Sequence, residues 1–129
     1  MKLVLDTYVV VSAFINPNGK PSQVLKIALS RKAELFYNPA IICEYESVML
    51  RPKFSKIVDP NYICRFINLL RNIGVSFNPI PGKVKLPDES DRFFYDTAKQ
   101  SGSFLISGNI KHFPKEPFIR SPVDFLKLL

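Results

Sequence analysis

Acidic side chains gather in one stretch of this otherwise basic sequence. The chain has 18 Lys and Arg residues against 11 Asp and Glu residues, and four of the acids fall between Asp88 and Asp96. Carboxylates held close together repel one another, so their proton affinity rises and a divalent cation becomes their natural neutraliser. Such a cation activates water and stabilises charge on phosphoryl oxygens, so a pocket of these acids would be suited to phosphodiester hydrolysis.

Two further polar residues follow apolar runs that we interpret as buried strands. Asp6 comes directly after the run LVL, and Asn109 follows the run FLIS at 104–107. Sites in open parallel sheets form beyond the carboxyl ends of the strands, so both side chains are candidates for a site there. Asp6 also has a structural interpretation, because an Asp at this point can cap the next helical turn.

The other candidate acids have structural interpretations as well. Glu44 lies beside the apolar stripe of a predicted helix, where a Glu can instead reach solvent or pair with a base. Asp88 and Asp91 have the spacing of a helix cap and the third helical residue. Asp91 and Asp96 project about 140° apart on a helix, with about 7.5 Å of axial rise. They can line one pocket only if other elements supply the remaining ligands.

The elements that must position these residues alternate along the chain. Short apolar runs predict strands at 3–6, 34–38, 75–80, 104–107 and 117–122. Periodic apolar positions predict helices at 21–29, 40–50, 60–73 and 89–100, with a helical tail at 123–129. This alternation is typical of a parallel sheet with helices on both faces, and we expect a single domain over residues 1–129.

Composition excludes several classes of protein. No window approaches the roughly 18 consecutive apolar residues that a membrane span needs, and Asp6 interrupts the apolar start, so we expect a cytoplasmic protein without a signal peptide. Cys43 and Cys64 show neither CxxC spacing nor a nearby His, which predicts buried free thiols. The net charge of +7 suits a polyanionic partner, although a solvated basic face would give the same composition.

Four motifs, in this order and spacing, resemble the PIN domain family: LVLDTYVVVSAF, EYESVMLRPKF, DESDRFFYDTA and FLISGNIKHFP. The resemblance extends from Lys2 to about Leu126 and is to the bacterial branch described as toxin components of toxin–antitoxin pairs. It implies an α/β, three-layer PIN-like fold with a central, mainly parallel sheet flanked by helices. It also implies an endoribonuclease dependent on Mg²⁺ or Mn²⁺, with RNA as substrate and an antitoxin protein as partner. Oligomers are common among such relatives, which makes a homo-oligomer a further expectation.

The resemblance assigns roles to individual residues by motif position. The implied metal-binding and catalytic acids are Asp6, Glu44, Asp91 and Asp96. Thr7 and Ser107 match the small hydroxyl residues that flank the pocket in the family, which implies that they contact the substrate. Asn109 departs from the family pattern, because many members carry an acid after this glycine. Its amide oxygen can still coordinate a hard cation, so four carboxylates and Asn109 would hold one ion tightly and any second ion weakly.

The remaining candidates concern substrate contacts and alternative functions. Candidate phosphate contacts are Arg51, Lys53 and Lys111, and His112 could contact a phosphate or a base, unless it is merely packed or exposed. Tyr8 and Phe54 could stack a base, although core or partner contacts are the commoner role. One alternative function is a PIN fold weakened or inactivated by Asn109, which binds RNA or another partner. A phosphatase of the haloacid dehalogenase type is disfavoured because Tyr8 stands where that chemistry needs a second Asp.

Overall fold

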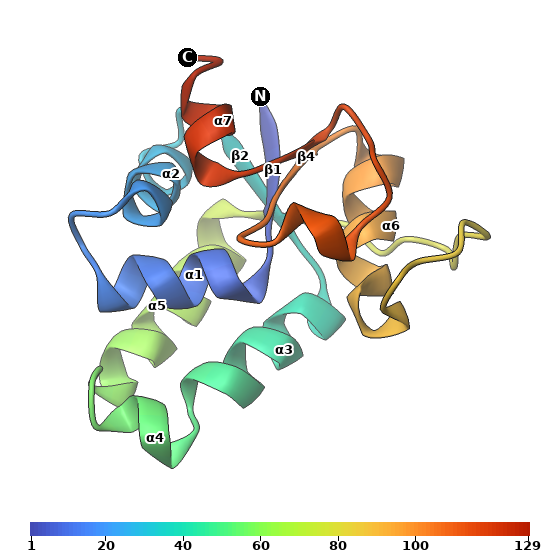
Figure 1. Cartoon of the computed structure of the whole chain (residues 1–129). Coiled ribbons are helices and arrows are strands. Elements are labelled where there is room, and N and C mark those ends of the chain that lie inside the picture. Colours follow the sequence, from blue (N-terminus) through green and yellow to red (C-terminus); the bar gives the residue numbers. More distant parts are fainter.

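A five-stranded parallel sheet forms the centre of the protein. The computed structural model describes all residues from 1 to 129, and its strands lie in the order β3-β2-β1-β4-β5 (Figure 1). The strands are β1 (Lys2–Leu5), β2 (Glu34–Tyr37), β3 (Val75–Ser76), β4 (Phe104–Ile106) and β5 (Ile119–Arg120). Every neighbouring pair is parallel. The predicted α/β class and parallel sheet are therefore confirmed.

Helices flank this sheet. They are α1 (Thr7–Ile15), α2 (Lys20–Leu29), α3 (Pro39–Met49), α4 (Pro52–Ser55), α5 (Pro60–Ile73), α6 (Arg92–Ser101) and α7 (Pro122–Leu126). Two single 3₁₀ turns, η1 (Glu89–Asp91) and η2 (Ile110–His112), precede α6 and follow β4. Helix α1 packs against α2, and α6 packs against β1 and β4, so the central strands are covered by helices (Figure 1). No helix is both long enough and apolar enough to cross a bilayer.

Helix α1 is the longest element that the sequence pattern does not predict, and the short α4 is another. The three consecutive valines of α1, Val9 to Val11, are β-branched and lower the helix propensity of the segment. Two effects outweigh that propensity. The Asp6 side chain caps the helix by accepting the Val9 N–H, and Val9 and Val10 are fully buried in the core. Tertiary packing and the cap therefore make this segment helical.

The strand β3 is much shorter than the predicted strand at 75–80. Only Val75 and Ser76 are strand residues, and the Phe77 N–H adds one more bond, to the Tyr37 carbonyl. Pro79 and Pro81 follow at once and have no N–H to continue a ladder. The chain then runs as an irregular segment to the start of η1.

One buried side chain, Asn38, fixes the elements that carry the candidate acids. Its Oδ1 accepts the Ile41 N–H at 3.0 Å, which caps α3. Its Nδ2 donates to the Phe77 carbonyl at 3.1 Å and to the Thr97 hydroxyl of α6 at 2.8 Å. A single amide thus joins the end of β2, the start of α3 and the middle of α6, so Glu44 on α3 has a fixed position relative to α6.

The prediction of buried cysteines is wrong. Cys43 on α3 and Cys64 on α5 are both exposed free thiols. Their apolar neighbours Ile42 and Ile63 occupy the buried positions instead. Adjacent residues on a helix project about 100° apart, so an apolar neighbour in sequence does not put a side chain on the apolar face.

Candidate active site

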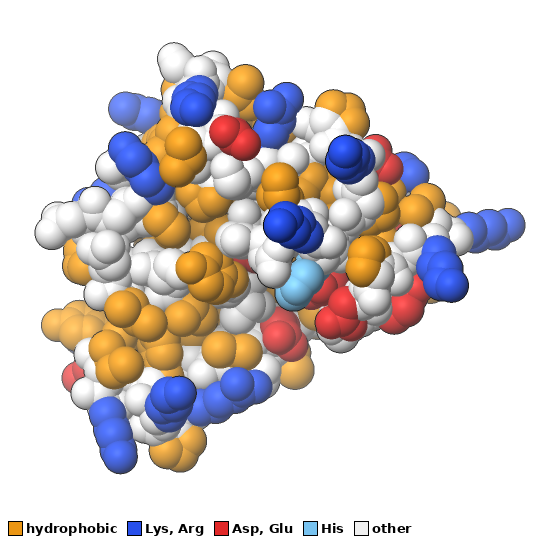
Figure 2. Space-filling view, in the orientation of Figure 1, with side chains coloured by type: hydrophobic (Ala, Val, Ile, Leu, Met, Phe, Trp, Pro, Cys, Tyr) orange, Lys and Arg blue, Asp and Glu red, His pale blue; other side chains and the backbone are white.

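A pocket of about 350 Å³ opens beyond the carboxyl ends of β1 and β4. These two strands end side by side, with Leu5 opposite Ile106, so the residues that follow them meet at one edge of the sheet. The pocket is lined by Asp6, Thr7, Tyr8, Glu44, Asp91, Phe94, Gly108, Asn109 and His112. Acidic side chains gather on this face of the protein, with Lys and Arg side chains around them (Figure 2). The pocket therefore joins segments from both halves of the sequence.

Asp6 both caps helix α1 and lines the pocket, the two roles that its position in the sequence allows. Its Oδ1 accepts the Val9 N–H at 2.9 Å and so caps α1, while its Oδ2 accepts the Gly108 N–H at 3.3 Å. The pKa of Asp6 is raised, chiefly because burial disfavours the charged form. Hydrogen bonds from the Ser107 hydroxyl and from these two N–H groups oppose the rise, and the charge of Asp91 adds to it. Capping and a place in the pocket are thus compatible.

Asp91 is the last residue of η1, immediately before α6, and makes no capping hydrogen bond with its side chain. Burial is the main reason that its pKa is raised, followed by the charge of Asp88. The charge of His112 opposes the rise, and that of Glu44 on α3 adds to it. Since Asp91 raises the pKa of Asp6 in turn, three carboxylates from three separate elements lie in one electrostatic environment.

Because its pKa is raised, the ionised Asp91 should destabilise the metal-free fold at neutral pH. A carboxyl whose pKa is raised in the folded state binds its proton more tightly there than in the unfolded chain. The free energy of unfolding therefore falls as the pH rises from the ordinary Asp pKa of 3.8 through the pKa of the folded state. We therefore expect Asp91→Asn to raise the midpoint of thermal unfolding in EDTA at about pH 7, and to lose this advantage near or below the ordinary Asp pKa. A lower midpoint at neutral pH would contradict the assignment of a repelled carboxylate.

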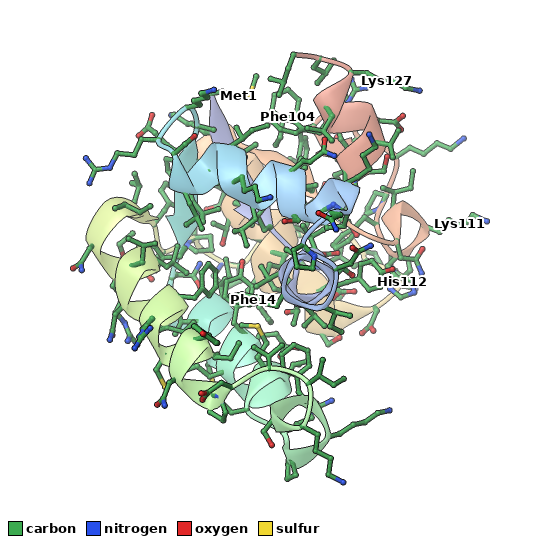
Figure 3. All side chains as sticks on the ribbon, turned by 90° about the vertical axis from the view of Figure 1, so that its left-hand side faces the viewer. Met1, Phe14, Phe104, Lys111, His112 and Lys127 are labelled. Carbon is green, nitrogen blue, oxygen red and sulfur yellow. The ribbon has the colours of Figure 1, made fainter.

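His112 lines the pocket, although its place in the sequence left its role open. Its Nε2 lies 3.0 Å from Asn109 Nδ2, and its Nδ1 lies 4.0 Å from Asp91 Oδ2. The 3₁₀ turn η2 brings residues three apart onto the same side, and this turn begins directly after Asn109. The three-residue spacing of Asn109 and His112 is the feature of the sequence that could have indicated their contact. Figure 3 shows His112 beside Lys111, whose side chain extends away from the protein.

The structure places Asp96 outside the pocket, which corrects the expectation that it points inward. Asp96 is 3% exposed, and its Oδ2 accepts the Gly82 N–H at 2.9 Å. Its Oδ1 lies 3.5 Å from Arg92 Nη1, and Arg92 also donates to the Gly82 and Val84 carbonyls. The five-residue separation from Asp91 turns the side chain toward the segment before η1. We therefore leave Asp96 out of the candidate ligand set.

The other predicted contacts differ in their relation to the pocket. Thr7 lines it, and the Thr7 hydroxyl is buried without a hydrogen-bond partner. Ser107 is buried behind the lining, where its hydroxyl accepts the Asn109 N–H at 3.0 Å. The three basic candidates are exposed and do not line the pocket, so their contact with phosphates stays a prediction: Arg51, Lys53 and Lys111.

A parallel sheet in the order 3-2-1-4-5, with acids beyond the carboxyl ends of its central strands, is consistent with the class of PIN-type nuclease domains. The sequence matches the PIN domain family over residues 2–111, and the chain belongs to this family. It is also 32% identical over 110 residues to the uncharacterized protein MJ1680 of Methanocaldococcus jannaschii. The matched region covers 84% of this chain and 71% of that protein. PIN domains are a family of nucleases, and they typically use divalent metals.

The donor set of the pocket fits a hard divalent cation by its chemistry. No three His, Cys, Asp or Glu side chains are gathered as a ready-made metal site. The pocket nevertheless contains three carboxylates and the Asn109 amide, which are oxygen donors of the kind that Mg²⁺ and Mn²⁺ accept. A bound cation would also offset the burial and repulsion that raise the pKa values of Asp6 and Asp91.

Proposed function

We propose that this protein is an endoribonuclease that hydrolyses RNA phosphodiester bonds with Mg²⁺ or Mn²⁺ held by Asp6, Glu44 and Asp91. The observation that carries the proposal is the convergence of these carboxylates from three elements in one pocket. The direct test is incubation of the purified protein with labelled single-stranded RNA in Mn²⁺, in Mg²⁺ and in excess EDTA. Cleavage that requires the cation is expected, and intact RNA under all conditions would contradict the proposal.

The residues of the pocket would have separate roles in such a reaction. When bound, the cation supplies an activated water and neutralises charge on the phosphoryl oxygens. Two backbone N–H groups hold the Asp6 carboxylate in one orientation, which preorganises it. The Asp91 side chain makes no capping hydrogen bond and lines the pocket, so its carboxylate oxygens are free to hold the cation or a water bound to it.

The cellular role we propose is that of the toxin of a toxin–antitoxin pair, acting in the cytoplasm and inhibited by an antitoxin protein. The basis is the motif resemblance to that branch of the family, together with the net charge of +7, which suits RNA. A homo-oligomer is part of the same proposal. Expression of the wild-type chain alone should stop growth, whereas expression of Asp91→Asn should not. A short neighbouring reading frame that restores growth when co-expressed would identify the antitoxin.

A second candidate is an RNA-binding or interaction module with little or no catalysis. Two points favour it. The motif resemblance implies that Asn109 stands where many family members carry an acid, and the carboxylates are not gathered as a ready-made ligand set. The cleavage assay separates the candidates if binding is measured beside it. RNA that is bound but unchanged in both Mg²⁺ and Mn²⁺ would favour the module.

Asn109→Asp is expected to tighten the binding of Mn²⁺ by roughly tenfold, about 1.4 kcal/mol. The substitution adds a carboxylate to the lining of the pocket, where a cation gains another charged oxygen. Isothermal titration calorimetry measures the change. Asn61→Asp, on the exposed side of α5, adds the same charge away from the pocket and should leave binding unchanged. Weaker binding by Asn109→Asp would show that Asn109 is no part of the site.

A further inference from the structure

A large aromatic side chain is exposed at the edge of the acidic pocket. Tyr8, the second residue of α1, lines the pocket, yet 61% of it is accessible to solvent. The other aromatic residue considered for base stacking, Phe54, is 7% exposed and belongs to the hydrophobic core. Of these two candidates, only Tyr8 is therefore placed to meet a substrate.

The position of the Tyr8 ring depends on Gly108. A Cβ atom added to Gly108 would lie 1.7 Å from Cδ1 and 2.2 Å from Cε1 of Tyr8, so the ring rests directly on the Gly108 backbone. The same glycine donates its N–H to the Asp6 carboxylate at 3.3 Å. The ring and the carboxylate are thus both held by the loop that follows β4, which gives the ring a defined place relative to the pocket acids.

We propose that Tyr8 forms a stacking subsite for one unpaired nucleobase of the RNA, next to the phosphate that enters the pocket. This inference rests on the proposed nuclease function and adds a contact to a base, beside the contacts to the phosphate. An exposed aromatic ring stacks on the π-face of any base without reading its sequence. In a duplex both faces of each base are covered by its neighbours, so a paired strand offers nothing to this ring.

The chemistry of the pocket gives such a subsite a clear use. The pocket carboxylates Asp6, Glu44 and Asp91 repel the phosphate backbone until a cation is bound. A contact between a base and an uncharged ring does not suffer this repulsion and is less sensitive to salt than phosphate contacts. The subsite therefore positions the strand through a base while the cation and the acids act on the phosphate.

The test is a set of double-mutant cycles between Tyr8 and the individual bases of an RNA decamer of mixed sequence. All proteins carry Asp91→Asn so that the RNA stays intact, and binding is measured by fluorescence anisotropy. Decamers with one abasic nucleotide at each position in turn are compared with the unmodified decamer. Tyr8→Ala should weaken binding of the unmodified decamer roughly 5- to 150-fold, the range of base–aromatic stacking, and Tyr8→Phe should restore it.

The cycle distinguishes stacking from a merely structural role. Removing one particular base should weaken binding by the protein with Tyr8 but not by Tyr8→Ala, and an RNA duplex should bind both equally. Gly108→Ala, which displaces the ring, should behave like Tyr8→Ala. Tyr62→Ala is the matched control, because Tyr62 on α5 is 56% exposed and does not line the pocket.

Two results would overturn the inference. Equal binding of the decamer by the proteins with Tyr8 and with Ala at that position would show that the ring contacts no base. A loss of affinity that is the same at every abasic position, and equal for the duplex, would show that Tyr8 acts only on the fold. If the wild-type protein still cleaves RNA in either case, the stacking subsite is refuted while the proposed function stands.

Discussion

Asp6→Asn and Asp91→Asn are each expected to abolish metal-dependent RNA cleavage while the fold survives. Changes in the outer shell of a metal site cost about 10- to 100-fold in affinity or activity, so loss of a ligand should cost at least about 100-fold. Asn is nearly the same size as Asp and is an equally good helix cap, so the cap of α1 is kept in Asp6→Asn. For Asp91→Asn the absence of protein hydrogen bonds to the side chain leads to the same expectation.

Cleavage of labelled RNA in Mn²⁺ measures the activity of each variant, and circular dichroism verifies that the variant is folded. Asp88→Asn is the matched control, because it removes the same charge three residues from Asp91 and is outside the pocket. Asp88 caps η1 through the Ser90 N–H, and Asn can replace it there. This control should cleave RNA at nearly the wild-type rate. Full cleavage by both pocket variants, or by the wild type in excess EDTA, would refute the catalytic assignment.

Asp96→Ala is expected to lower the free energy of unfolding by about 2 kcal/mol, because it leaves a partly buried N–H and part of an ion pair without an acceptor. The N–H belongs to Gly82, and the ion-pair partner is Arg92. Cleavage per folded molecule should remain close to that of the wild type, since Asp96 does not line the pocket.

Urea denaturation gives the stability change for this second prediction. Glu89→Ala is the control, because Glu89 also pairs with Arg92, at 2.6 Å, but its side chain is 58% exposed. An exposed pair of this kind contributes little to stability because solvent screens it, so the control should be less destabilised. If Asp96→Ala instead lost cleavage and kept its stability, Asp96 would be a ligand, as the motif resemblance implies.

Much of the sheet could be predicted because its central strands are buried on both faces. In β1, solvent reaches none of Leu3, Val4 and Leu5. A strand buried on both faces has an unbroken run of apolar residues, which can be recognised in the sequence. The helices α3, α5 and α6 could be predicted from apolar periodicity, within a few residues at their ends. Helix α1 could not, because its β-branched residues are typical of a strand and its cap and burial become visible only in the fold.

The candidate site was partly predictable for a similar reason. Asp6 and Asn109 interrupt or follow buried strands, and the motif resemblance adds Glu44 and Asp91; the structure brings all four to one pocket. The direction of Asp96 depends on the irregular segment around Gly82, which has no periodic pattern to predict. The places of Tyr8 and His112 depend on close packing against Gly108 and on the turn η2, which sequence spacing indicates only weakly.

The hydrogen bond between Asp6 and Gly108 joins residues 102 positions apart. A ribosome adds Asp6 well before the loop that holds its carboxylate, because 102 positions separate Asp6 from Gly108. The central strand β1 likewise lacks its neighbour β4 until Phe104–Ile106 have been made. A partly synthesised chain therefore carries every pocket acid before it can assemble the pocket. We expect the pocket to assemble on a nascent chain only after β4 and Gly108 have been made.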